Sequence, residues 1–117
     1  MLLDRNGKLV KSLDFRGTKI EFLDKLTAKE LFQINASAQQ AVNFMFRFKA
    51  TDLAPQEWKG SVYQPIMEAC GGDRAMALRL FGVVIKQALI MTPLLYRQET
   101  ENANWEAVTY VRESLKF

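Results

Sequence analysis

Histidine is missing from this chain of 117 residues. Its absence removes the commonest general base, the usual partner of a serine or cysteine nucleophile and the commonest transition-metal ligand. No Asp/Glu spacing in the sequence matches a calcium loop. We therefore expect no enzymatic activity, no metal and no cofactor.

Cysteine is scarce as well, because Cys70 is the only one. A single cysteine forms no internal disulfide and builds no zinc site by itself. The N-terminus also lacks a charged region followed by an apolar signal core. These features favour a reducing, cytoplasmic setting.

Glycine and proline are few, at six and three residues, whereas 49% of the chain is hydrophobic. This composition is the opposite of a disordered chain, and the length suffices to bury a substantial core. We expect a single domain over residues 1–117. The most apolar stretch, residues 75–95, is long enough to cross a bilayer, but Arg79 and Lys86 lie within it. We predict a buried helix there and no membrane association.

Charge of one sign is not in large excess, since the formal net charge is +3. Residues 1–29 hold seven Lys or Arg against four acids, and the remainder holds nine of each. This bias favours an acidic partner or nucleic acid, although dedicated DNA-binding domains carry more positive charge. The alternative is a solvated hairpin surface.

The beginning of the chain is typical of a β-hairpin or small meander. Leu2 and Leu3 on one side, and Leu9 and Val10 on the other, flank a turn whose Asn-Gly pair suits the positive φ angles of a tight hairpin turn. Polar and apolar residues alternate again at positions 19–22, as on a half-buried strand. Two or three short strands are expected.

The rest of the chain predicts helices. Thr27-Ala28-Lys29-Glu30 has the form of a capping box, and apolar residues then recur at three- and four-residue steps to about Ala50. Residues 44–48 also fit a strand, because their Phe residues alternate. We favour the helix, since no breaker precedes them.

Proline, glycine and aspartate residues mark the boundaries of the helices predicted in the second half of the chain. A helix near residues 61–70 must hold Pro65 in its first turns. Gly71-Gly72-Asp73 predicts a stop and restart, with the aspartate capping a strongly apolar helix from Arg74 to about Met91. Thr92-Pro93 either kinks this helix or caps a new one.

The end of the chain predicts a polar loop at residues 98–104 and a last amphipathic helix at 105–115, because apolar residues recur there at helical spacing. The fold class is then mainly α: a compact helical domain with a short N-terminal β-hairpin or meander. Residues 1–25 form the hairpin region, and residues 27–117 form the helical body.

Two segments resemble known families. Residues 67–83, with a Gly-containing turn and an Ala-rich helix ending in Leu80-Phe81-Gly82-Val83, resemble the first part of the helix-turn-helix of Fis-type regulators. The recognition helix would begin at Val84 and is too apolar for a major-groove face, so this helix-turn-helix would be degenerate.

The second resemblance covers residues 15–31. A short strand, the turn at Gly17, an extended segment and the Leu26-Thr27 capping box are similar to the start of the tail assembly chaperones of long-tailed bacteriophages. The resemblance implies a small protein with a helical body that coats a long, extended phage protein during tail building. It implies no catalytic residues.

Candidate contact residues lie outside the predicted core. Phe44 and Phe46 fall off the apolar stripe of their helix, which favours partner contacts unless a second element covers them. Arg79 and Lys86 are two helical turns apart and mark a solvent or partner edge. Trp105 is either an interface anchor or a core residue.

Our leading hypothesis is a non-enzymatic protein-binding module, either a phage assembly chaperone or an inhibitor-like adaptor. Self-association as a homo-oligomer is also expected, because the apolar helix at 74–91 is hard to cover with so short a chain. The alternative is a small nucleic-acid-binding protein. It would use either the degenerate helix-turn-helix or the basic residues of the N-terminal hairpin, which are Arg5, Lys8, Lys11, Arg16 and Lys19.

Overall fold

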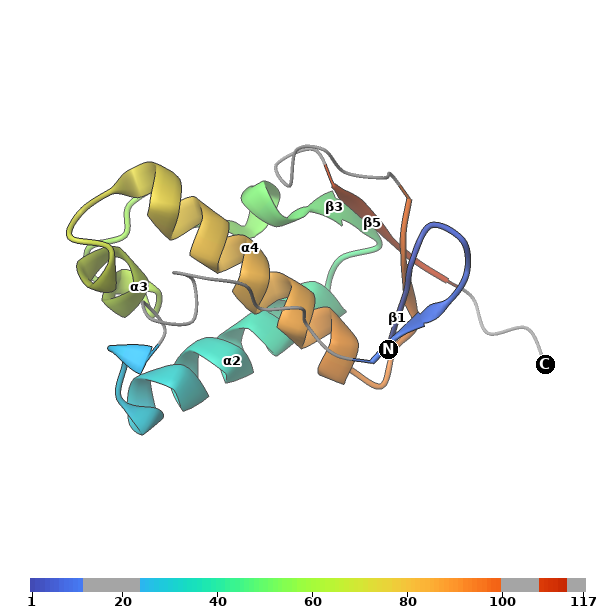
Figure 1. The fold of residues 1–117 in the computed structure, drawn as a ribbon, viewed down its shortest axis with the longest axis horizontal. Helices are drawn as coiled ribbons and strands as arrows, with labels where there is room; N and C mark the ends of the chain where they lie inside the picture. The colour runs from blue at the N-terminus through green and yellow to red at the C-terminus, as the bar shows by residue number, and fades with distance from the viewer. Residues whose placement is uncertain (12–23, 100–107, 114–117) are drawn as a thin grey trace.

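Helix α4, Arg74–Met91, is the central element of the fold. The computed structural model describes residues 1–11, 24–99 and 108–113, and α4 runs through the middle of this part (Figure 1). Asp73 accepts a hydrogen bond from the Met76 amide, which confirms the predicted N-cap. Seven of its residues are buried: Ala77, Leu80, Phe81, Val84, Ile85, Ala88 and Leu89.

Helix α2, Ala28–Asn43, lies along α4. The predicted capping box is confirmed, because the Thr27 side chain accepts from the Glu30 amide and the Glu30 carboxylate accepts from the Thr27 amide. The buried residues of α2 recur every four positions and face α4; they are Ile34, Ala38 and Val42. One side of α2 is therefore core, and the other faces outward.

Helix α3, Gln64–Ala69, packs on the beginning of α4 and carries a proline in its first turn, as predicted. Gly71 and Gly72 have φ angles of +63° and +84°, which let the chain reverse between α3 and α4. Aromatic rings close this end of the core, with Tyr63 and Trp58 each edge-on to Phe81.

The predicted N-terminal hairpin is present, with β1 at Leu2–Leu3 and β2 at Leu9–Val10. The Asp4 carboxylate accepts hydrogen bonds from the Asn6 and Lys8 amides, and Gly7 takes the positive φ of +82°. The strand expected at residues 19–22 lies outside the described residues.

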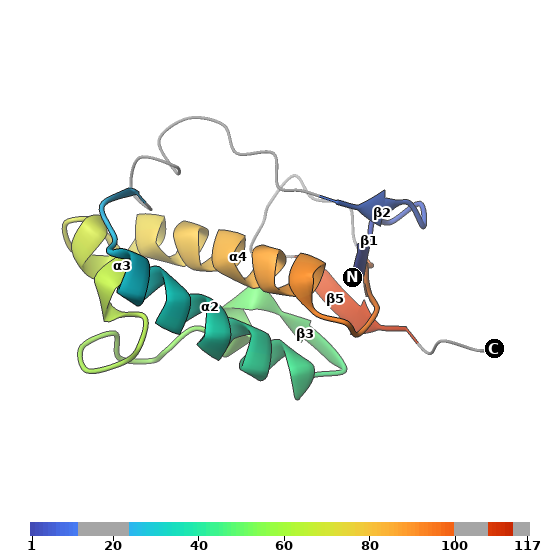
Figure 2. The same ribbon diagram turned by 90° about the horizontal axis from the view of Figure 1, so that it is seen from below.

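Three further strands join this hairpin in one mixed sheet. They are β3 at Arg47–Lys49, β4 at Tyr96–Gln98 and β5 at Thr109–Arg112, and the strand order is β2-β1-β4-β5-β3. Among the strands of the described residues, β1 and β4 pair in parallel and the other pairs are antiparallel. The sheet lies at the end of the long helices where α2 and α4 finish (Figure 2). A 3-10 helix, Ala50–Leu53, follows β3.

The predicted fold class is therefore wrong. The protein has an α+β fold rather than a mainly α fold, and its sheet draws strands from both ends of the described chain. The hairpin is no separate appendage to a helical body, because Leu2 of β1 pairs with Tyr96 of β4. Both residues are fully buried, so the sheet is part of the core.

The first error concerns the helix predicted to continue to about Ala50. Helix α2 ends at Asn43, and residues 47–49 form β3. The alternative strand interpretation of residues 44–48 is correct only from Arg47 onward, where Phe48 points into the core while Arg47 and Lys49 are exposed. Pairing with β5 decides the conformation, and local sequence does not show that partner.

The second error concerns the end of the chain. Residues 109–112, predicted as part of a helix, form strand β5, and Gln98, predicted as loop, ends strand β4. Val108 and Tyr110 are buried and alternate with half-buried Thr109 and Val111. This short run satisfies helical and strand spacing equally, so tertiary pairing selects the strand.

Helix α4 also contradicts the helix-turn-helix interpretation. It continues without a break through Gly82, where a turn was required, and Val84 and Ile85 are buried instead of reaching a groove. Since α2, α3 and the 3-10 helix pack against it, its apolar surface no longer argues for self-association. Among the described helices, none combines the length and apolar character needed to cross a bilayer.

Candidate functional site

Two phenylalanines project from the chain where α2 leads into β3. The exposed fractions of Phe44 and Phe46 are 76% and 69%. The alternative that a second element covers them is therefore wrong. Phe44 is the C-cap residue of α2, and Phe46 immediately precedes β3, so both belong to one tight connection.

Arg112 of β5 fixes this connection. Its guanidinium carbon lies 4.4 Å from the centroid of the Phe46 ring, at cation–π distance. The same guanidinium donates a hydrogen bond from Nη2 to the Asn43 carbonyl at the end of α2. Its charge thus faces the negative end of the helix dipole. We call Phe44, Phe46 and Arg112 the aromatic corner.

Tyr96 of β4 contacts Arg112 of the aromatic corner from the protein core. Its hydroxyl accepts hydrogen bonds from Arg112, at 2.9 Å from Nη2 and 3.2 Å from Nε. It also lies within donating distance of the carbonyl oxygens of Val42 and Met45. Because Tyr96 is fully buried, this network holds the last turn of α2 and the connection in one arrangement.

The backbone ladder adds a further restraint. The Arg112 amide donates to the Phe46 carbonyl at 2.7 Å, which extends the pairing of β3 with β5. The Arg47 guanidinium and the Glu99 carboxylate form an ion pair at 2.8 Å beside it. Both aromatic rings are thus displayed on a backbone that is already ordered.

The other predicted contact residues lie elsewhere. Arg79 is exposed and Lys86 half-buried on α4, and neither belongs to the aromatic corner. Trp105 lies outside the described residues. Arg112 and Tyr96 were missed in the sequence, because their role depends on strand pairing. Phe32 of α2, which is 74% exposed, was missed as well, although its position off the apolar stripe could have revealed it.

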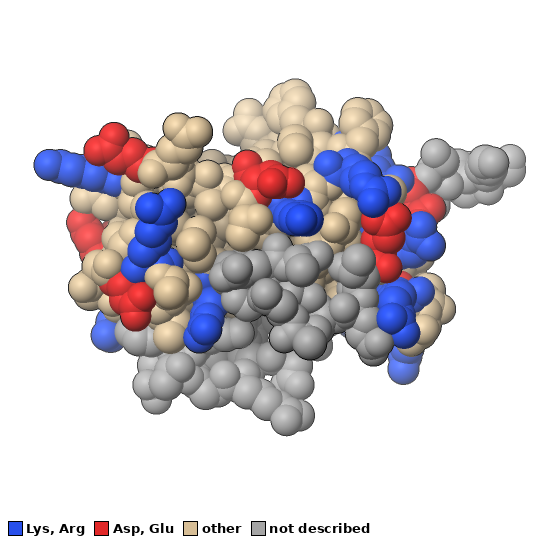
Figure 3. All heavy atoms as spheres, turned by 90° about the horizontal axis from the view of Figure 1, so that it is seen from above, with Lys and Arg blue, Asp and Glu red and all other residues tan. Residues whose placement is uncertain are grey.

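The residues predicted for nucleic-acid binding are only partly described. Arg5, Lys8 and Lys11 are exposed around the hairpin, whereas Arg16 and Lys19 lie outside the described residues. On the face shown in Figure 3, Lys and Arg side chains are interleaved with Asp and Glu. The described residues on that face therefore present mixed charge and no broad basic surface.

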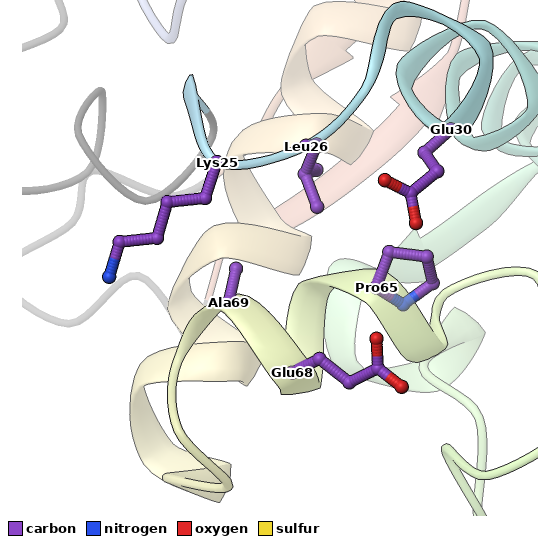
Figure 4. A pocket seen from close by; sticks show the side chains of 6 residues that line it. All are labelled: Lys25, Leu26, Glu30, Pro65, Glu68 and Ala69. Carbon is purple, nitrogen blue, oxygen red and sulfur yellow. The ribbon is translucent and has the colours of Figure 1, made fainter.

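A shallow depression of about 240 Å³ lies between the start of α2 and α3 (Figure 4). Both carboxylates that line it already accept hydrogen bonds. The Glu30 carboxylate accepts one from the backbone amide of Thr27, and the Glu68 carboxylate accepts one from the side-chain amide of Gln64. Within the described residues no group of three potential metal ligands occurs. The described residues that line the depression therefore do not indicate a catalytic or metal-binding site.

Cys70 is a further group with potential reactivity. It is free and buried, and burial raises the pKa of its thiol, as does the negative charge of Asp73, while Lys25 acts in the opposite direction. A raised pKa reduces the thiolate fraction, which is the nucleophilic form. The thiol therefore has the environment of a core residue.

Comparisons of the chain with protein-family models, with curated proteins and with solved structures give no significant match.

Proposed function

We propose that this protein is a non-enzymatic protein-binding module that contacts its partner through the aromatic corner. The observation that carries the proposal is the exposure of Phe44 and Phe46 on an ordered connection. Full burial of a Phe side chain stabilises a complex by about 1.5–3 kcal/mol, and aromatic and arginine residues are enriched among the contacts that dominate protein interfaces.

The network behind the corner supports the same proposal. Arg112 and Tyr96 hold the connection before any partner arrives, so little conformational entropy is lost when the two rings are buried. Arg112 also offers a cationic group beside an apolar surface. The partner therefore presents an apolar pocket or groove, with an acidic or carbonyl group near Arg112.

We propose the cytoplasm as the place of action and a phage tail assembly chaperone as the most specific form of this function. An extended client with apolar side chains would suit two neighbouring exposed rings. A nucleic-acid-binding role through Arg5, Lys8 and Lys11 is the competing proposal. It is motivated by their exposure on the hairpin.

The test is affinity capture from the cells that produce the protein, with and without nuclease. Three baits are compared: wild type, the double variant Phe44→Ser/Phe46→Ser, and the control Val62→Ser, which changes a 38% exposed residue before α3. We expect one protein to be retained by wild type and control after nuclease, and to be lost from the double variant. Circular dichroism and thermal unfolding check that each bait is folded. Capture of nucleic acid, with proteins lost after nuclease, would overturn the proposal.

A further inference from the structure

Strand β3 is the last strand of the described sheet, and its outer edge carries backbone groups without a partner strand (Figure 1). The Phe46 carbonyl accepts from the Arg112 amide, and Phe48 lies opposite Tyr110, so the backbone groups of Phe46 and Phe48 face β5. Because these groups alternate along an antiparallel strand, those of Arg47 face away from β5. Within the described residues they form no hydrogen bond. Such an edge can pair with a further strand.

The open part of this edge is short. The Lys49 amide, which also faces outward, donates to the Asp52 carboxylate at 2.9 Å. The 3-10 helix begins at the next residue, Ala50. One residue, Arg47, therefore offers both its amide and its carbonyl group. Antiparallel pairing suits a single open residue, because both hydrogen bonds then go to one residue of the added strand.

Side chains at this edge present cations on one face and an aromatic ring on the other. Arg47 and Lys49 are exposed on the face opposite that of Phe46, whose exposed fraction is 69%. The Arg47 side chain stays 67% exposed although it pairs with Glu99. No carboxylate in the described part of the chain forms an ion pair with Lys49.

The complementary strand has alternating acidic and apolar residues. Opposite charges on directly facing residues stabilise a sheet, and so do apolar residues that face aromatic ones. A second copy of β3 does not suit the edge, because a two-fold pair centred on Arg47 would place like charges opposite each other. A nucleic acid supplies phosphates for the cations but no backbone that continues a β-ladder.

We infer that the edge of β3 binds an extended segment of the partner protein as an added antiparallel strand. Acidic side chains of this segment face Arg47 and Lys49, and apolar side chains cover Phe46. This mode of recognition takes affinity from main-chain hydrogen bonds and specificity from alternate side chains. The inference rests on the proposed function, since it names the part of the partner that reaches the aromatic corner.

Amide hydrogen exchange of the full chain tests the added strand. The probe is a short synthetic peptide in which valine and glutamate alternate. We expect the Arg47 amide to exchange rapidly in the protein alone and to be protected when this peptide is present. A peptide in which valine and lysine alternate should give no protection. Failure of the valine–glutamate peptide to protect the Arg47 amide, or equal protection by both peptides, would overturn the inference.

N-methylated peptides test the register. The residue paired with Arg47 has its side chain on the same face as Arg47, so it is a glutamate of the probe. N-methylation of the glutamate amides should raise the dissociation constant at least about tenfold, a change of about 1.4 kcal/mol, whereas N-methylation of the valine amides should change it less than about twofold. The reverse order would show a different pairing and overturn the inference.

Substitution of a lysine tests the charge. Lys49→Gln should raise the dissociation constant of the valine–glutamate peptide by about twofold to fivefold. The matched control Lys59→Gln, at an exposed site before α3, should leave it unchanged. Equal effects of the two substitutions would overturn the inference. So would an oligothymidylate that binds wild type and not Lys49→Gln while the peptide fails to bind, because the cations would then serve a nucleic acid.

The peptide measurements do not use the captured partner, so the two proposals fail separately. Peptide protection of the Arg47 amide in a protein that captures no partner would reject the proposed function alone. Capture of a partner that depends on Phe44 and Phe46, with no protection by the peptide, would reject the added strand alone.

Discussion

The guanidinium of Arg112 stacks on the ring of Phe46 while it donates to the hydroxyl of Tyr96, at 2.9 Å from Nη2. One side chain of β5 thus reaches both an exposed ring and a buried hydroxyl. Through this pair of contacts, the core determines the position of the surface that we propose to bind a partner.

Replacement of Arg112 by lysine should test this connection. Arg112→Lys keeps the positive charge but loses the planar fork that contacts Tyr96, Asn43 and the Phe46 ring together. We expect the free energy of unfolding to fall by about 1–3 kcal/mol, measured by urea denaturation. The control Arg79→Lys, at an exposed site on α4, should change it by less than about 0.5 kcal/mol. Equal effects at both sites would contradict the account.

The Tyr96 hydroxyl should matter more than that of Tyr63. Tyr96→Phe leaves the carbonyl groups of Val42 and Met45 without their buried donor, and we expect a loss of about 1–3 kcal/mol in the free energy of unfolding. Tyr63→Phe removes only a part-buried bond to the Ser37 hydroxyl, which water can replace, so its loss should be smaller. Denaturant unfolding of both variants gives the comparison, and the reverse order would refute the proposed role of Tyr96.

Alkaline pH should destabilise the fold through Tyr110. Burial raises the pKa of this tyrosine from its ordinary value of 10 to about 12. The unfolded chain therefore releases the proton at a lower pH than the folded chain, and the free energy of unfolding falls as pH rises between these values, by up to about 3 kcal/mol.

Thermal unfolding of wild type and Tyr110→Phe across pH 9 to 12 measures this effect, because lysine titration is common to both proteins. As pH rises, wild type should lose more of its free energy of unfolding than Tyr110→Phe, so the variant should become more stable relative to wild type. A difference that stays constant with pH would show that Tyr110 ionises alike in both states.

The N-cap of α4 should contribute a measurable part of the stability. Asp73→Ala removes the acceptor for the Met76 amide, and we expect a loss of about 0.5–2 kcal/mol in the free energy of unfolding. Asp73→Asn retains a capping oxygen and should lose less. If both variants match wild type, the cap has no energetic role.

The sequence predicted the features that depend on neighbouring residues. The capping box at Thr27, the cap at Asp73 and the turn at Gly7 each result from contacts within a few positions, and all three are confirmed. It did not predict β3, β4 and β5, because each is at most four residues long and gains its hydrogen bonds from distant segments.

The candidate site was predicted in part for the same reason. Phe44 and Phe46 were recognisable as aromatic residues off an apolar stripe, even though the helix assigned to them was wrong. The contact of Arg112 with Phe46 could not be predicted from the sequence, because it follows from the pairing of β3 with β5. Errors in strand prediction therefore hid the element that makes the corner rigid.

Photo-cross-linking in living cells tests the central claim most directly. A benzoylphenylalanine replaces Phe46 in one protein and Val62 in a control, since both sites are exposed but only the first belongs to the aromatic corner. The account predicts a discrete adduct with another protein from position 46 and none from position 62. Adducts of equal yield at both positions, or adducts with nucleic acid alone, would contradict it.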